Sequence, residues 1–318
     1  MAYGAAGMGN LLRTVPDEES TGAAAAAWDC GVRYFDVAPH YGLGLAERRL
    51  GLALRNRPRG EFLVSTKVGR LLRPVPNPTR ARDEEGFDVP ADFLRVRDYS
   101  RDGVRQSLES SLERLGLDRI DIVFVHDPDD FYREALDGAF PALEELRVEG
   151  AITSYGAGMN QSEILTRFVE RTDLDVVMLA GRYTLLEQGA LDDLLPACLE
   201  RGVSVVAAGV FNSGILATDL PQRSATYNYQ PTDEDTFDRA QRLAAVCARF
   251  GTSLPAVAAR FPLAHPAIST VCLGAYSAEQ VRRNAALFDI DLPDGVWSEL
   301  RAEGLLRTDA PTPDATPR

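Results

Sequence analysis

The feature that most constrains the fold of this chain is an alternation of apolar strand-like runs with helical segments. Short runs rich in β-branched residues are typical of buried strands, and helical periodicity follows each of them. Strands are expected at 3–9 (with a Gly-rich turn), 32–38, 61–67, 120–126, 151–156, 175–180, 203–208 and 267–273. Helices are expected at 14–29, 45–55, 100–115, 134–149, 162–170, 189–201, 233–250, 254–261 and 277–287.

This alternation predicts a parallel sheet with helical crossovers. Eight strand-helix units favour an α/β fold closed into a (β/α)8 TIM barrel, with a doubly wound open sheet as the alternative. No break in composition divides the chain, so a single domain is predicted over residues 1–307. Residues 308–318 hold three prolines and few apolar side chains, and we expect a disordered C-terminal tail there.

Two long segments, 68–98 and 211–231, are predicted as loops. A loop of such length in a compact domain is typically a functional lid or a disordered segment. Both are therefore expected to shape a binding pocket if one lies at their end of the barrel.

Composition narrows the class of protein. The formal net charge of −13 argues against nucleic acid as a partner, since nucleic-acid binding favours clustered positive charge. Four widely spaced cysteines and three histidines give no metal-binding pattern, and the cysteines suit the reducing cytoplasm. The sequence has no signal peptide and no apolar run of membrane-spanning length. We expect a cytoplasmic monomer or small homo-oligomer that acts on a small molecule, without metal.

Four side chains are expected at the ends of strands or directly after them: Asp36, Tyr41, Lys67 and His126. In a parallel barrel these positions surround one mouth. At about 4 Å and an effective dielectric constant near 20, the charge of Lys67 and a Tyr41 phenolate attract by roughly 4 kcal/mol, which lowers the tyrosine pKa by about 3 units. Asp36 would hold the ammonium, and His126 would hydrogen-bond a substrate oxygen. Each residue alone has an ordinary structural explanation, but the shared position favours proton transfer beside a hydride acceptor.

Residues 35–42, 65–67 and 125–128 resemble the signature of the aldo-keto reductases. The resemblance covers nearly the whole chain. It implies a (β/α)8 barrel that binds NAD or NADP at the C-terminal face of the strands. It also implies Tyr41 as general acid/base, Lys67 and Asp36 as the groups that tune it, and His126 as the residue that orients the substrate.

The same resemblance implies the cofactor contacts. Asn160 follows the fifth strand and is expected to bind the nicotinamide carboxamide, while Phe211 is expected to stack on the ring. The full predicted set is Asn160, Phe211, Gly214, Gly274, Ala275, Ser277, Gln280, Arg283 and Asn284. For the stretch after the eighth strand, the alternative is a plain strand-to-helix turn capped by serine.

Cofactor choice depends on cations near the adenosine ribose. Where members that prefer NADP commonly carry cations, this chain is aligned with Gly274 and Gln280. Arg282 and Arg283 lie nearby, but both are also interpretable as solvated helix residues. NAD is therefore expected to be used at least as well as NADP.

Segments 179–186 and 209–216 resemble a narrower branch, the bacterial aldose 1-dehydrogenases that act on L-fucose and other D-threo-aldoses. The expected reaction is oxidation of the anomeric hydroxyl of an aldose to a lactone. Pyridoxal 4-dehydrogenase and a general aldehyde or ketone reductase are the alternatives within the family. A non-catalytic nucleotide-sensing subunit is disfavoured by the intact tetrad, and a metal-dependent barrel hydrolase by the scarcity of histidines.

Overall fold

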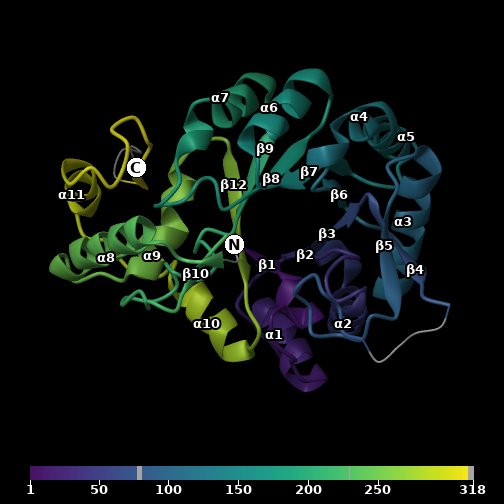
Figure 1. Cartoon of the computed structure of the whole chain (residues 1–318), viewed down its shortest axis with the longest axis horizontal. Coiled ribbons are helices and arrows are strands. Elements are labelled where there is room, and N and C mark those ends of the chain that lie inside the picture. Colours follow the sequence, from purple (N-terminus) through teal and green to yellow (C-terminus); the bar gives the residue numbers. More distant parts are fainter. Residues whose placement is uncertain (77–80, 229, 314–318) are drawn as a thin grey trace. The chain divides into compact units, whose positions relative to one another are not determined.

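The computed structural model describes residues 1–76, 81–228 and 230–313. Eight parallel strands form a closed barrel in the order β1-β12-β9-β8-β7-β6-β3-β2 (Figure 1). The predicted (β/α)8 fold is therefore confirmed, and the open-sheet alternative is wrong.

The barrel strands are β1 (Ala2–Gly4), β2 (Tyr34–Asp36), β3 (Leu63–Val68), β6 (Ile122–His126), β7 (Ser154–Met159), β8 (Val176–Ala180), β9 (Ser204–Ala208) and β12 (Ile268–Gly274). The helices are α1 (Asp17–Asp29), α2 (Leu45–Leu54), α3 (Arg101–Leu115), α4 (Tyr132–Glu134), α5 (Phe140–Val148), α6 (Ser162–Arg171), α7 (Leu194–Arg201), α8 (Glu234–Arg249), α9 (Leu254–Arg260), α10 (Ala278–Ala286) and α11 (Val296–Ala302). Among the described residues, no helix is long and apolar enough to cross a membrane.

The chain forms two compact units, each built from stretches that are separate in sequence. Unit 1 contains Met1–Met159, Arg171–Val177 and Leu273–Arg283. Unit 2 contains Asn160–Glu170, Met178–Cys272 and Asn284–Arg318. The single-domain assignment of residues 1–307 stays a prediction.

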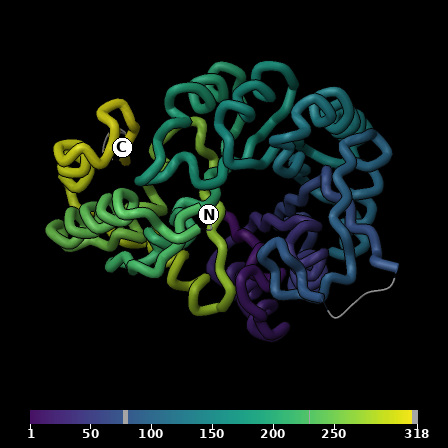
Figure 2. The backbone as a smooth tube through the Cα atoms, in the orientation of Figure 1, coloured from purple at the N-terminus to yellow at the C-terminus, as the bar shows by residue number. Residues whose placement is uncertain are grey.

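Unit 1 contains five neighbouring barrel strands, β1, β2, β3, β6 and β7. Along the sequence, each of them pairs in parallel with the next of the five. Phe35 is paired with both Tyr3 and Val64, and Lys67 with Phe124. This register brings the carboxyl ends of β2, β3 and β6 to one edge of the sheet. The tube in Figure 2 follows this N-terminal run from purple through blue to teal.

Local sequence explains how the helices of each unit begin and end. The side chain of Ser100 accepts a hydrogen bond from the Gly103 N–H and so caps α3, which ends at Gly116 with φ of 63°. In unit 2, Asp233 caps α8 through the Thr236 N–H at 2.8 Å. Such caps satisfy N–H groups that a helix leaves unpaired at its start.

The segment 68–98, expected to be a loop, contains an antiparallel hairpin. Strands β4 (Arg70–Pro74) and β5 (Phe93–Arg97) pair along their length, beside α3 in Figure 1. Residues 77–80 within the same segment lie outside the described residues. In unit 2, the segment 211–231 holds a shorter pair, β10 (Thr226–Tyr227) and β11 (Gln230–Pro231).

The fifth barrel strand lies later in the sequence than predicted. A strand was expected at 151–156, but β7 spans Ser154–Met159, so Ala157 and Gly158 lie inside the strand and not after it. A close backbone approach explains the glycine at position 156, since a Cβ there would lie 1.6 Å from the Val176 carbonyl oxygen. Glycines in a strand often mark such a contact.

The predicted disordered tail differs from the structure over residues 308–313. Ala310 and Thr312 are both buried, and Arg301 donates hydrogen bonds to the Ala310 carbonyl oxygen and to Thr312 Oγ1 at 2.8 and 2.9 Å. One guanidinium thus anchors a proline-rich segment that composition alone marks as disordered. Residues 314–318 lie outside the described residues.

Candidate active site

The structure brings all four predicted catalytic side chains together within unit 1. Asp36 ends β2, Lys67 is the penultimate residue of β3, and His126 ends β6. Tyr41 lies in the loop between β2 and α2. Lys67 Nζ is 4.7 Å from the centroid of the Tyr41 ring, and the Tyr41 and His126 ring centroids are 5.9 Å apart.

Asp36 and Lys67 form a buried ion pair. Lys67 Nζ lies 2.7 Å from Asp36 Oδ2 and also donates to the Val37 carbonyl oxygen at 3.0 Å. Ser65 donates to Asp36 Oδ1 at 2.7 Å, so the carboxylate is held on both oxygens. Burial alone would lower the pKa of Lys67, but the neighbouring Asp36 and Tyr41 outweigh it and raise that pKa. The lysine is therefore a fixed positive charge under the phenol.

The net effect on Tyr41 differs from the prediction. Burial raises the pKa of Tyr41, and Asp36 adds to the rise, while the charge and hydrogen bond of Lys67 lower it. Burial is the larger effect, so the tyrosine pKa lies above its ordinary value rather than about 3 units below it. At neutral pH the phenol keeps its proton and is poised as a donor.

Two backbone glycines position the tyrosine loop. Gly42 has φ of 62°, and a Cβ there would lie 2.3 Å from the Gly9 carbonyl oxygen. A Cβ on Gly9 would in turn lie 2.6 Å from the carbonyl carbon of Tyr41. The Gly-rich turn after β1 thus serves as a close backbone support for Tyr41, and the sequence assigned it no role.

His126 is buried, and its imidazole is neutral. Burial, followed by the charges of Arg70 and Lys67, lowers the pKa of His126 well below its ordinary value. Its Nε2 lies 3.5 Å from Asp127 Oδ2, and its Nδ1 has no hydrogen-bond partner in the described part of the chain. A neutral imidazole in this place can donate one hydrogen bond to a substrate oxygen.

A second histidine beside the tetrad was not predicted. The rings of His40 and His126 are 5.5 Å apart, centroid to centroid. Burial, followed by the charges of Arg70 and Arg95, lowers the pKa of His40 to about 2. Sequence could not have indicated this, because both arginines come from the unpredicted hairpin.

The segment between the hairpin strands covers the tyrosine loop. Phe87 and Val89 are buried in a hydrophobic cluster with Leu43, against which the Tyr41 ring packs. The Phe87 ring centroid lies 6.0 Å from that of Tyr41 and 5.1 Å from that of His40. The described part of 68–98 therefore packs against the Tyr41 loop of the candidate site.

The predicted cofactor residues are divided between the units. Unit 1 holds Gly274, Ala275, Ser277, Gln280 and Arg283. Ser277 Oγ accepts a hydrogen bond from the Gln280 N–H at 3.3 Å, and Gln280 Oε1 accepts one from the Tyr276 N–H at 2.8 Å. The capped strand-to-helix turn is thus present, and the Gln280 side chain takes part in it. Arg283 is exposed.

Unit 2 holds Asn160, Phe211, Gly214 and Asn284. Phe211 packs against a hydrophobic cluster of Ala256, Ala259 and Leu287. Asn160 lies between β7 and α6, and Asn284 is buried in α10. Next to Phe211, the buried Asn212 donates to the Gly181 carbonyl oxygen, and its Oδ1 has no partner among the described residues.

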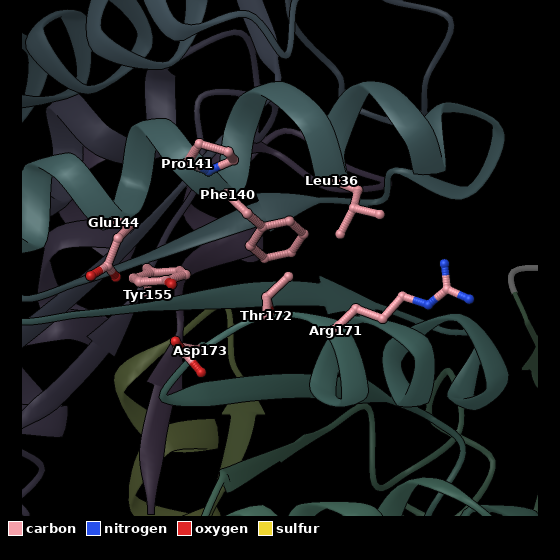
Figure 3. A pocket seen from close by; sticks show the side chains of 8 residues that line it. All are labelled: Leu136, Phe140, Pro141, Glu144, Tyr155, Arg171, Thr172 and Asp173. Atoms are coloured by element: carbon pink, nitrogen blue, oxygen red, sulfur yellow. The ribbon is translucent and has the colours of Figure 1, made fainter.

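Unit 1 also contains a hollow of about 520 Å³ away from these side chains, shown in Figure 3. Phe140 and Tyr155 form its wall, and Glu144 lies beside the Tyr155 ring (Figure 3). Glu144 accepts a hydrogen bond from Arg147, and burial followed by Glu144 raises the pKa of Tyr155. The hollow shares no residue with the tetrad and offers no activated nucleophile. Among the described residues, no group of histidine, cysteine or acidic side chains is arranged to hold a metal ion.

Comparisons with known proteins agree with this geometry. The model of the Aldo/keto reductase family matches residues 1–303. The chain is 47% identical to a D-threo-aldose 1-dehydrogenase from Pseudomonas sp, over 97% of this chain and 94% of that protein. It is 38% identical to a pyridoxal 4-dehydrogenase from Microbacterium luteolum, over 96% of this chain and 94% of that protein. Among solved structures, a glycerol dehydrogenase from Gluconobacter oxydans superposes with a TM-score of 0.77 at 25% identity, over 100% of this chain and 94% of that one.

Proposed function

Because the chain belongs to the aldo/keto reductase family, and is thus an NAD(P)-dependent oxidoreductase, we propose that it oxidises the anomeric hydroxyl of an aldose to a lactone. The proposed substrates are L-fucose and other sugars of the D-threo-aldose type, acted on in the cytoplasm. The observation that carries the proposal is the buried Asp36–Lys67 pair beneath Tyr41, with His126 beside it. The relative that shares 47% identity supports the substrate class.

The residues at the end of β12 suit a nucleotide phosphate. A Cβ on Gly274 would have the Gly4 carbonyl oxygen, 3.9 Å away, as its nearest neighbour, so there is space beside the Cα atom of this glycine. Helix α10 begins directly after Ser277, and a helix N-terminus attracts anions. In unit 2, Asn212 Oδ1, which has no partner within residues 1–76, 81–228 and 230–313, is an acceptor suited to an amide N–H. We assign cofactor contacts to Gly274, Ala275, Ser277, Gln280 and Arg283 in unit 1, and to Asn160, Phe211, Gly214 and Asn284 in unit 2.

Tyr41 carries the proton in the proposed mechanism. When bound, oxidised NAD(P) supplies the acceptor for the hydride that leaves the anomeric carbon. The Tyr41 phenolate takes the proton of the anomeric hydroxyl, and Lys67 stabilises that phenolate by its charge. His126 donates a hydrogen bond to the same oxygen and so orients it. In the reverse direction the protonated phenol gives its proton to the carbonyl oxygen.

The raised pKa of Tyr41 sets the expected pH dependence. Oxidation needs the deprotonated phenol, whose fraction grows as the pH approaches that pKa from below. Oxidation should therefore speed up toward alkaline pH, and carbonyl reduction should not.

The experiment is a panel of L-fucose, D-arabinose, L-galactose and pyridoxal, each with NAD and with NADP as the oxidant, and of simple aldehydes with NADH and with NADPH as the reductant. The proposal expects the highest kcat/KM with a D-threo-aldose and a lactone as the product. A higher kcat/KM with pyridoxal would support the second candidate, pyridoxal 4-dehydrogenase, which the relative at 38% identity favours. Reduction of simple aldehydes by NADH or NADPH, without oxidation of a sugar or of pyridoxal, would leave only general reductase activity.

We also propose that NAD is used at least as well as NADP. The reason is that Gly274 and Gln280 carry no cation for the 2′-phosphate of NADP, and the Gln280 side chain is used within the turn. The ratio of kcat/KM for the two cofactors tests this at one saturating sugar concentration. A preference for NADP above about tenfold, or roughly 1.4 kcal/mol, would contradict it and point to Arg282 or Arg283.

A further inference from the structure

Asp127, directly after His126, has an unusual backbone conformation. Its φ is 40°, a left-handed value that side chains other than glycine, asparagine and aspartate rarely adopt. Three contacts hold it there. Its N–H donates to the Gly158 carbonyl oxygen at 3.0 Å, its own carbonyl oxygen accepts from Arg97 at 3.1 Å, and its carboxylate binds Arg70. A conformation stabilised at so many points beside an active site often serves its geometry.

The carboxylate of Asp127 joins the hairpin to His126. Arg70 Nη2 donates to Asp127 Oδ2 at 2.5 Å, and the Arg70 side chain is only 9% exposed. The same Oδ2 atom lies 3.5 Å from His126 Nε2. The strong contact to Arg70 thus fixes the oxygen that faces the imidazole.

The position of that oxygen decides which ring nitrogen carries the proton. A neutral imidazole has one N–H and one lone pair, and the neutral state of His126 follows from its burial among cations. A carboxylate oxygen attracts an N–H and repels a lone pair. At 3.5 Å the contact is longer than the 2.7–2.9 Å typical of charge-assisted hydrogen bonds, so the N–H stays available to a substrate.

We propose that Asp127, held by Arg70, is a positioning residue that keeps the imidazole proton of His126 on Nε2. His126 then meets the substrate oxygen as a donor and not as an acceptor. The inference rests on the proposed function for its catalytic consequence, but the tautomer itself is a property of the unliganded protein. It gives the unpredicted hairpin a role in the chemistry through Arg70.

Two substitutions at Asp127 distinguish the effect of its acceptor oxygen from that of its backbone conformation. Asp127→Gly removes the carboxylate and accepts a positive φ without strain. Asp127→Asn also tolerates this φ and keeps an oxygen that can accept from Nε2. Asp130→Gly is the control, since Asp130 is exposed and lies three residues further on.

The measurement is the long-range ¹H–¹⁵N spectrum of the histidine side chains at neutral pH, together with kcat for the sugar. The chain has three histidines, and His126→Gln and His265→Gln assign the signals. We expect Nε2–H for His126 in the parent, in Asp127→Asn and in Asp130→Gly, but a mixture of tautomers in Asp127→Gly. The kcat of Asp127→Gly should fall roughly ten- to hundredfold, and Asp127→Asn should stay within a few fold of the parent.

Two results would overturn the inference. One is an unchanged Nε2–H tautomer in Asp127→Gly. The other is an equal loss of kcat in Asp127→Asn and Asp127→Gly, which would mean that charge and not an acceptor oxygen is needed. If the parent oxidises no sugar, the proposed function fails, while the spectra still decide the tautomer. Near-ultraviolet circular dichroism of each variant reports whether the fold is kept.

Discussion

The paired histidines beside Tyr41 predict that the protein loses stability in mild acid. His40 has a pKa lowered to about 2, and the pKa of His126 is lowered well below its ordinary value. In the unfolded chain both titrate near their ordinary value of about 6.5. Below that pH the two histidines bind protons in the unfolded state but not in the folded state, so the free energy of unfolding falls as the pH falls. The stabilisation is complete above about 6.5 and is lost progressively toward the folded-state pKa.

The size of the effect follows from the linkage relation. Between pH 7.5 and about pH 5.5, each histidine that stays neutral when folded lowers the free energy of unfolding by about 1 to 2 kcal/mol. Burial also lowers the pKa of His265, so all three histidines act in the same sense. The parent should therefore lose a few kcal/mol over this range, where carboxylates contribute little.

Urea unfolding at both pH values measures this loss, and His40→Gln isolates one contribution. The variant can be less stable at both pH values through lost packing, but the difference between the two pH values should shrink by about 1 to 2 kcal/mol. His40 is a suitable probe because its side chain is 13% exposed and it stands outside the tetrad. An identical pH-dependent loss in parent and variant would refute the argument that His40 is held neutral by its surroundings.

Three further variants probe the site. Asp36→Asn leaves the ammonium of Lys67 without its carboxylate and should lower the free energy of unfolding by about 3 to 5 kcal/mol in urea titrations. A loss below about 1 kcal/mol would show that the ion pair is dispensable for stability. Lys67→Met should shift the rise of sugar oxidation to higher pH, since the phenolate loses its stabilising charge, and an unmoved pH–rate profile in an active variant would count against this role. Gly42→Ala should lower both kcat and the melting temperature, because the new Cβ would meet the Gly9 carbonyl oxygen at φ of 62°; wild-type values in both would contradict the close contact.

Much of the barrel could be predicted from patterns along the chain. Buried strands have a recognisable apolar composition, and the ends of β2, β3 and β6 are marked by Asp36, Lys67 and His126 within such runs. Because parallel strands place their carboxyl ends at one edge, the grouping of these side chains followed from the topology alone. Asp36, Lys67 and His126 could be grouped without knowledge of loop conformation, whereas the place of Tyr41 depends on the loop after β2.

Other features depend on contacts that no local pattern records. The strand position of Gly156 requires glycine because a Cβ there would meet the Val176 backbone. Arg70 reaches Asp127 across 57 positions in the sequence. The predicted direction of the shift in the Tyr41 pKa was wrong for a similar reason. Lys67 and burial have opposite effects on this pKa, and their sizes cannot be compared without the packed structure.

The central claim is that Tyr41 transfers the proton of the sugar hydroxyl. Its direct test is the kcat of Tyr41→Phe with a D-threo-aldose, together with the affinity of this variant for the nucleotide, measured by calorimetry. Tyr155→Phe is the control variant. Tyr155 is a buried tyrosine of the same unit that lines the hollow away from the tetrad (Figure 3). The account predicts that kcat falls by at least about 10²-fold in Tyr41→Phe, with cofactor affinity unchanged and Tyr155→Phe near the parent. A Tyr41→Phe variant that turns over sugar within a few fold of the parent would contradict it.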